Sequence, residues 1–343
     1  MGELKDLLQF TPNGLYCPQA DVYIDPWTPV NKAIITHAHS DHARSGNLHY
    51  LSHRLSAPIM KHRLGADIQV QTVDYAQPIN INGVKVSLHP AGHVIGSAQV
   101  RLEYQGLIVV VSGDYKMTDD QLSTPFEPVP CHTFVTESTF GLPIYRWMAQ
   151  DKLYHQMQSW VADNKRKNRT SVFIAYSLGK AQRVMKALEG VGKIYVHKSI
   201  GNINELFEQN GIKLPNYEVI NEDTNLKSLS GEIVIFPPAL EGTTLMKKIP
   251  NAAIAACSGW MQVRGNRRWK SLDSGFAISD HADWPGLLSA ISQCGCEQVF
   301  VTHGYTATFS RYLNENGLSA AEVQTKFGEE HDEITTIDQI KSE

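Results

Sequence analysis

The stretch THAHSDHARSG, residues 36–46, places His37, His39, Asp41 and His42 within six consecutive positions. One histidine alone is ordinarily a surface or hydrogen-bonded side chain, but clustered groups that charge alike have little structural use. His37 and His39 are two apart, so on a strand they would point the same way and both reach one metal. Asp41 and His42, at a transition from strand to loop, can turn toward a second metal. Imidazole suits Zn, Fe or Mn, and carboxylate broadens the choice.

Three further residues of ligand type follow strand-like or glycine-flanked runs. His93 lies in the turn PAGHVIGSAQV, Asp114 follows the apolar run of VVVSGDYK, and His303 ends the apolar run of QVFVTHG. Taken singly, Asp114 can be an ordinary turn residue and His93 a turn or capping residue. A polar residue directly after a buried strand is placed at a sheet edge, where sites are built. The repetition of this arrangement therefore favours a function in metal binding.

The composition predicts a folded protein of a reducing cytoplasm. The chain has 343 residues, which is long for one simple domain and comfortable for two. The sequence contains no tract of about 18 apolar residues, so we expect no membrane span. The start MGELKDLLQF lacks the features of a secretory signal. Five sparse cysteines do not form a disulfide framework, and we expect Cys294 and Cys296 to be buried thiols between a helix and a strand. The net charge of −4 means that a polyanion would need a local basic surface.

Periodicity divides the chain into three segments. Residues 1–143 are dense in short strands, and GVKVSLHPAGH is followed by a hairpin whose turn is Gln105-Gly106. Residues 144–272 begin with a helical pattern and then alternate strands with helices, which predicts a parallel sheet with helices packed on it. Residues 273–343 return to a strand, a helix and a strand. We therefore expect the middle segment to be an insertion within the first domain.

The ligand pattern resembles that of the metallo-β-lactamase fold. This resemblance implies an α/β protein, an αββα sandwich, with two divalent metal ions, Zn or Mn, at one edge. It implies that the first metal is held by His37, His39 and His93. It implies that the second metal is held by Asp41, His42 and His303. Asp114 would bridge the two metals, and Asp25, in YIDP, would orient ligands rather than bind metal.

Three motifs narrow the resemblance to a branch of that superfamily. TESTFG with Glu137, SDHAD with His281 and VTHG with His303 resemble motifs A, B and C of the β-CASP nucleases, which act on DNA or RNA. In that branch an α/β domain is inserted into the metallo-β-lactamase domain, at the place of segment 144–272. Longer stretches, among them AYSLGKAQRV, SGWMQVRGNRRW and ISDHADWPGLL, look like the bacterial ligase-associated DNA exonucleases. This resemblance implies a cytoplasmic DNA-repair exonuclease that works with a DNA ligase and a helicase.

Other functions remain open at the level of sequence. A histidine in motif C, here His303, is the pattern of RNA-processing β-CASP enzymes, so a ribonuclease is the first alternative to a DNA enzyme. A thioesterase or lactonase shares the metal site, but a small ester needs neither Glu137, nor His281, nor an inserted domain. A non-catalytic nucleic-acid scaffold is a third alternative, against which the full ligand set argues.

The resemblance also suggests a mechanism. Two metals can activate a shared water and clamp a phosphate oxygen, and loss of Asp41 would disable such a site. His281 is the candidate general acid for the leaving oxygen, because imidazole titrates near neutrality. Glu137 would orient His281 and favour its charged form. If the 3′-oxygen leaves, the products carry a 5′-phosphate.

Basic residues outside the metal motifs are candidates for substrate binding. The run VRGNRRWK contains Arg264, Arg267 and Arg268 beside an aromatic residue, and arginine forks suit phosphates. A solvated loop is the ordinary alternative for this run. Lys180 follows Gly179 at the start of a helix, where a phosphate can bind. We expect DNA, rather than RNA, to be the nucleic-acid partner.

Overall fold

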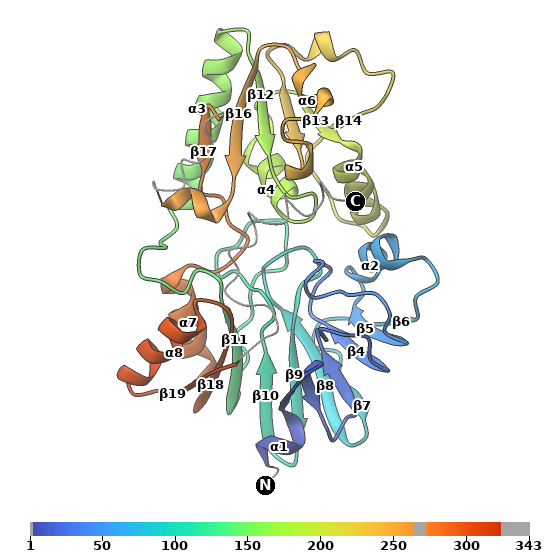
Figure 1. Cartoon of the computed structure of the whole chain (residues 1–343), viewed down its shortest axis with the longest axis vertical. Coiled ribbons are helices and arrows are strands. Elements are labelled where there is room, and N and C mark those ends of the chain that lie inside the picture. Colours follow the sequence, from blue (N-terminus) through green and yellow to red (C-terminus); the bar gives the residue numbers. More distant parts are fainter. Residues whose placement is uncertain (1–2, 264–271, 324–343) are drawn as a thin grey trace. The chain divides into compact units, whose positions relative to one another are not determined.

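The computed structural model describes residues 3–263 and 272–323. Within these residues the chain forms two units (Figure 1). The first unit combines the residues up to Tyr145 with those from His281 onward, and the second is the intervening segment Arg146–Asp280. The chain thus leaves the first unit after residue 145 and returns to it at residue 281.

The first unit contains two mixed sheets. The strands of the first sheet follow the order β1-β2-β3-β4-β5-β6. They are β1 (Gln9–Thr11), β2 (Gly14–Cys17), β3 (Val22–Ile24), β4 (Lys32–Ile35), β5 (His49–His53) and β6 (Val70–Val73). The second sheet has the order β19-β18-β11-β10-β9-β8-β7. Its strands are β7 (Ile79–Ile81), β8 (Val84–Pro90), β9 (Ala98–Tyr104), β10 (Leu107–Val111), β11 (Thr133–Ser138), β18 (Gln298–Gly304) and β19 (Ser319–Glu322).

The second sheet is covered on both faces at its centre. Val109 and Val111 of β10 pack in one core cluster with Ile24 and Ile34 of the first sheet, whereas Val110, between them, packs in another cluster. This alternation follows from the two-residue period of a strand. Burial on both faces explains why LIVVV is a continuous apolar run rather than an alternating one.

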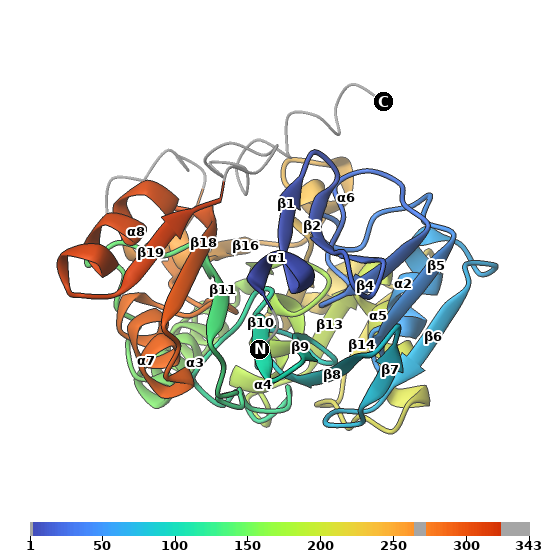
Figure 2. The ribbon, with the colours of Figure 1, turned by 90° about the horizontal axis from the view of Figure 1, so that it is seen from below.

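Helices pack against the second sheet and connect strands of the first. Helix α7 (Trp284–Cys294) and helix α8 (Thr306–Glu315) share a core cluster with residues of β10, β11 and β18 (Figure 1). The short helix α1 (Leu4–Leu7) contacts β9 and β10 (Figure 2). Helix α2 (Ala57–Leu64) connects β5 to β6 in the first sheet. The expected α/β class is confirmed, and the paired sheets agree with a metallo-β-lactamase type of fold.

The strand directions gather several loops at one edge of the sheets. Strands β10, β11 and β18 are parallel, so their carboxyl ends lie along the same edge. The β8–β9 turn lies there too, because β9 runs antiparallel to β10. The backbone N–H of Ala98, at the start of β9, donates to the Thr36 carbonyl at 2.8 Å and ties the loop after β4 to this edge.

The second unit is a parallel sheet with helices on it, as the alternating pattern predicted. The strand order is β14-β13-β15-β12-β16-β17 and every pair is parallel. The strands are β12 (Thr170–Ile174), β13 (Ile194–His197), β14 (Glu218–Ile220), β15 (Ile233–Phe236), β16 (Ala252–Cys257) and β17 (Ser274–Phe276). The α-helices are α3 (Gln150–Arg166), α4 (Lys180–Ala187), α5 (Lys198–Gln209) and α6 (Thr244–Lys247). The described part of this unit also contains the 3-10 turns η1 (Leu226–Leu229), η2 (Pro238–Leu240) and η3 (Gly259–Gln262).

The end of this unit differs from the bound expected at residue 272. Strand β17 pairs with β16 over Ser274–Phe276 and extends the parallel sheet, so the contacts place residues up to Asp280 in the second unit. The sequence offered no signal for this, because a strand of three residues is too short to show a period. Among the residues that the structure describes, no helix is both long and apolar enough to cross a membrane.

The stretch that carries the first ligand candidates is a loop, and the expectation of a strand at His37 and His39 was wrong. Strand β4 ends at Ile35. The backbone after Ile35 forms a turn, in which the N–H of Ala43 donates to the carbonyl of His39 at 2.8 Å. The two side chains converge nevertheless, because the turn, rather than a strand pleat, directs them.

Candidate metal centre

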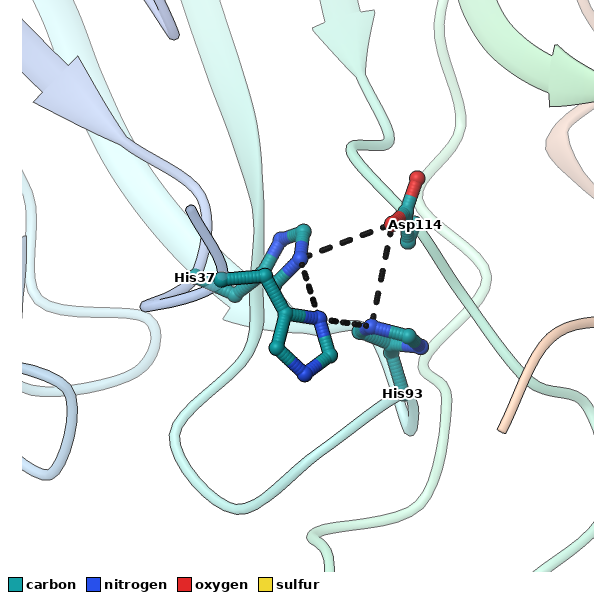
Figure 3. Close-up of side chains that lie close together, drawn as sticks. His37, His93 and Asp114 are labelled. Carbon is teal, nitrogen blue, oxygen red and sulfur yellow. Dashed lines mark hydrogen bonds and ion pairs between the residues drawn. The ribbon is translucent and has the colours of Figure 1, made fainter. Parts of the chain in front are cut away.

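Four of the expected ligands form one compact cluster. His39 Nδ1 lies 3.1 Å from His37 Nε2 and 3.0 Å from His93 Nε2. Asp114 Oδ2 lies 3.5 Å from His37 Nε2 and 3.7 Å from His93 Nε2 (Figure 3). The loop after β4 contributes two of these residues, the β8–β9 turn contributes His93, and the loop after β10 contributes Asp114. One nitrogen or oxygen of each residue thus lies within 4.8 Å of the others.

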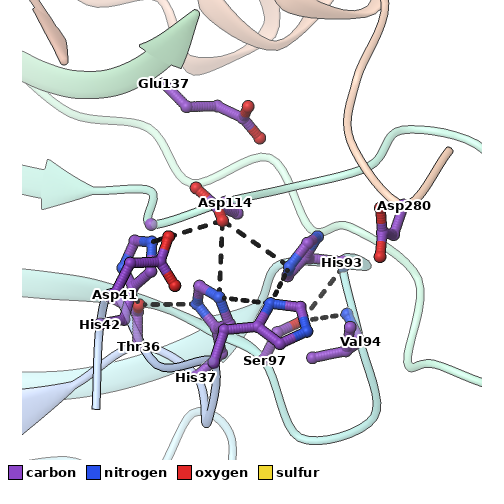
Figure 4. Close-up of polar contacts among 12 residues, drawn as sticks. Thr36, His37, Asp41, His42, His93, Val94, Ser97, Asp114, Glu137 and Asp280 are labelled. Atoms are coloured by element: carbon purple, nitrogen blue, oxygen red, sulfur yellow. Dashed lines mark hydrogen bonds and ion pairs between the residues drawn. The ribbon is translucent and has the colours of Figure 1, made fainter. Parts of the chain in front are cut away.

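A second cluster shares Asp114 with the first. His42 Nε2 lies 3.3 Å from Asp114 Oδ2 and 3.5 Å from Asp41 Oδ2 (Figure 4). The His303 ring is centred 5.5 Å from that of His42, at the end of β18. Asp114 is therefore placed between the two groups of residues that the sequence assigned to two metals.

Charge and burial suit this donor set to cations. Burial, together with the neighbouring His42 and His93, holds the pKa of His37 well below its usual value, which leaves the ring neutral. Although burial opposes ionisation of Asp114, His42 and the other histidines hold its pKa well below the usual range. Neutral imidazoles and ionised carboxylates are the forms that bind metal.

His42 differs from His37 because carboxylates surround it. Burial acts to lower its pKa, but Asp114, Asp41 and Asp25 outweigh burial and raise the pKa of His42 well above the usual value. The surroundings of Nε2 thus favour a positive charge, which a metal ion can supply in place of a proton. The donor set fits divalent cations.

Hydrogen bonds orient two histidines of the clusters. Asp25 Oδ2 lies 2.7 Å from His42 Nδ1 and accepts the Thr36 hydroxyl at 2.6 Å, while Asp25 Oδ1 accepts the Thr36 N–H at 2.8 Å. Thr36 Oγ1 also lies 3.1 Å from His37 Nδ1. Both rings therefore present Nε2 to the cluster, as bonds to the other ring nitrogen do in metal sites. Sequence reasoning missed Thr36, although it begins the decisive stretch.

We expect Asp25→Ala to weaken metal binding by roughly 10–100-fold, because outer carboxylates fix the ring orientation and basicity of ligand histidines. Competition with a chromogenic chelator would measure the affinity. Asp21→Ala is a matched control, since Asp21 is exposed and pairs with Lys32 at 3.2 Å. Equal affinities of the two variants would show that Asp25 does not orient a metal ligand.

Glu137 and His281 meet beside the shared aspartate. Glu137, only 1% exposed on β11, lies with Oε2 2.9 Å from His281 Nδ1. Its Oε1 accepts the backbone N–H of Tyr115 at 2.7 Å, and the carbonyl of Tyr115 accepts the N–H of Ala282 at 2.6 Å. Tyr115, the residue after Asp114, is thus bonded to Glu137 and to the residue that follows His281. This burial excludes the reading of Glu137 as a surface carboxylate.

Of the candidate substrate-binding residues, the structure describes Lys180. Arg264, Arg267 and Arg268 lie outside the described residues. Lys180 is 2% exposed at the start of α4, with Nζ 3.6 Å from Asp280 Oδ1 and 4.8 Å from the Tyr176 ring centroid. Its role in substrate binding stays a prediction. Cys294 ends α7 and Cys296 precedes β18, and both thiols are free and buried, as expected.

Comparisons with known proteins give partial matches. No family model matches the chain. A probable DNA ligase of Opitutus terrae is 29% identical over 311 residues, which are 90% of this chain and 30% of the ligase. The endoribonuclease YSH1 of Candida glabrata is 33% identical over 125 residues, 35% of this chain and 16% of that protein. Subunit 3 of the cleavage and polyadenylation specificity factor of Dictyostelium discoideum is 27% identical over 124 residues, 35% of this chain and 16% of the subunit.

The chain thus spans less than a third of the length of each of these three relatives. Among solved structures, a protein of unknown function from Enterococcus faecalis V583 has a TM-score of 0.62 at 13% identity. The match covers 87% of this chain and 80% of that one. At this identity the likeness shows a common fold alone.

Proposed function

We propose that this chain is a two-metal nuclease that hydrolyses phosphodiester bonds, with DNA as its substrate. The observation that carries the proposal is that the buried Glu137 and the half-buried His281 pair beside Asp114, the carboxylate shared by the two groups of candidate ligands. A metal site alone is compatible with many hydrolases. A histidine held by a buried carboxylate at that site adds a proton donor for a poor leaving group.

The ligand roles follow the resemblance and the distances. His37, His39 and His93 would hold one ion, Asp41, His42 and His303 would hold the other, and Asp114 would lie between them. Two divalent ions, Zn or Mn, supply Lewis acidity and an activated water when bound. Asp25 and Thr36 keep the ring nitrogens directed at the cluster.

The Glu137–His281 pair supplies the proton that the leaving group needs. Glu137 accepts the bond from Nδ1 of His281, which fixes the ring and stabilises its charged form. His281 then donates the proton on Nε2 to the departing 3′-oxygen, so the other product carries a 5′-phosphate. A small activated ester needs no such acid, which distinguishes this site from that of a thioesterase or lactonase.

The relatives support a nucleic-acid substrate. The match to a protein described as a probable DNA ligase runs over 90% of this chain, which supports DNA and a functional association with a ligase. The shorter matches to an endoribonuclease and to an RNA cleavage factor support the alternative of a ribonuclease. A role in bacterial DNA repair, a helicase partner and a cytoplasmic location come from the resemblance to ligase-associated exonucleases.

Product mapping tests this proposal. We expect 5′-labelled single- or double-stranded DNA to be degraded with Mn²⁺ or Zn²⁺ faster than the matching RNA, and we expect Asp41→Ala to remove this activity. Denaturing gels of labelled products would show both the polarity and the terminal phosphate. Faster cleavage of RNA than of DNA would show that RNA, rather than DNA, is the substrate. Cleavage that persists in Asp41→Ala would overturn the two-metal assignment.

A further inference from the structure

We propose that Arg63, near the end of α2, binds a backbone phosphate adjacent to the one that is cleaved, an inference that rests on the proposed nuclease function. Nothing in the spacing of the motifs points to Arg63, which lies 21 residues after His42 in a different element. The assignment comes from where the tertiary structure places its guanidinium.

Arg63 reaches the loop that carries the ligand histidines. Its Nη1 donates to the Ala38 carbonyl at 2.5 Å, and Ala38 stands between His37 and His39 in the chain. This contact joins the end of α2 to the metal loop, although the two are far apart in sequence. The guanidinium is therefore anchored beside the candidate metal centre.

The contact to Ala38 uses one of the five N–H donors of a guanidinium. The Arg63 residue is exposed overall, although its contact to Ala38 is partly buried, and no ion pair of its guanidinium is found within residues 3–263 and 272–323. Partial burial against the metal loop lowers the pKa of the Arg63 guanidinium, and the carboxylate of Asp41 in that loop acts in the opposite direction. The Asp41 side chain is itself 42% exposed, so solvent reaches the cluster on this side. An anionic ligand can approach Arg63 and the metal loop together.

Three other arginines of the same unit have their charge balanced by a nearby carboxylate. Arg54 lies 2.7 Å from Asp74, Arg101 lies 2.7 Å from Glu103, and Arg311 lies 2.8 Å from Glu315. The last turn of α2 instead gathers Lys61, His62 and Arg63, and its first turn has no acidic residue. The basic end of α2 is thus a local positive surface in a chain of net charge −4.

The ligand that fits this surface is a polymer of phosphates. A planar guanidinium matches phosphate oxygens with two parallel bonds, and an arginine already anchored by one bond loses less freedom on binding. A nucleic-acid strand that presents one phosphate to the metals presents the next one close by. A small phosphodiester has no second phosphate, so Arg63 should act on the polymer selectively.

The test compares an oligonucleotide with bis(p-nitrophenyl) phosphate as substrates of the metal-loaded full chain. We expect Arg63→Gln to lower kcat/KM for the oligonucleotide on the order of 10-fold more than for the small diester. The slope of log kcat/KM against log salt should also fall by roughly 0.7 for a single strand, the share of one phosphate contact. Arg63→Lys should restore the slope, because it keeps the charge. Arg311→Gln, an equal change of charge at an exposed site, is the control.

The outcomes separate this inference from the proposed function. If Arg63→Gln matches Arg311→Gln on the oligonucleotide, Arg63 binds no phosphate. If it lowers both substrates equally, or loses metal by elemental analysis, Arg63 only holds the loop through Ala38, which also overturns the inference. If the natural chain cleaves the small diester but neither binds nor cleaves DNA or RNA, the proposed nuclease function fails, and this inference fails with it.

Discussion

We expect His281→Ala to lower kcat for DNA hydrolysis by about 10²–10⁴-fold, the usual contribution of a general acid, with little change in metal content. The alkoxide that leaves a phosphodiester is a poor leaving group without a proton, and His281, which lies beside Asp114, is the donor that we propose. Single-turnover kinetics would measure the chemical step, and elemental analysis would measure the metal.

The pH profile and two further variants sharpen this test. In the natural chain, kcat should fall at high pH, where the general acid loses its proton. His281→Ala should not show this fall. Glu137→Gln should give a smaller loss of kcat, because it weakens the bond at Nδ1 but leaves the ring in place. His155→Ala, at an exposed position of α3, is the histidine control. Unchanged turnover in His281→Ala with normal metal content would remove His281 from the mechanism.

We expect Asp114→Asn to abolish cleavage and to reduce the number of ions bound per chain. Asp114 Oδ2 approaches His42, His37 and His93 within 3.3, 3.5 and 3.7 Å respectively. An amide has almost the same shape but no negative charge, so packing is kept while the shared ligand is lost. Elemental analysis and thermal unfolding with and without added metal would measure the effect.

Thermal unfolding also gives this prediction a second readout. An ion that binds the folded chain raises the melting temperature, so Asp114→Asn should show a smaller rise on addition of metal than the natural chain. Asp21→Asn, at an exposed site, is the control and should respond as the natural chain does. A full complement of metal and full activity in Asp114→Asn would exclude Asp114 as a ligand.

Local features of the fold were predictable where a short pattern carries the physics. The turn Gln105-Gly106 joins β9 to β10, and both residues have positive φ, 47° and 83°, which suits a tight hairpin. The alternation of strands and helices predicted the parallel sheet of the second unit. The short β17 escaped detection because three residues are too few for a period.

The candidate ligands were also predictable, whereas the reason that they converge was not. Spacing identified His37 and His39 but placed them on a strand, and the structure puts them on a loop. That loop is shaped by bonds to Asp25 and to Arg63, which come from other elements. Sequence distance gives no measure of such contacts, because they depend on how sheets and helices pack.

The sequence by itself determined which side chains are available for metal and proton chemistry, since residue type and local spacing are written in it. The family resemblance implied that Glu137 orients His281, and the tertiary structure added that these residues, 144 apart in the chain, touch beside Asp114. Only the tertiary structure decided that Arg63 reaches the carbonyl between two ligand histidines. The physical reason is that a turn is set by its own few residues, whereas a meeting of distant elements is set by the burial of the whole core.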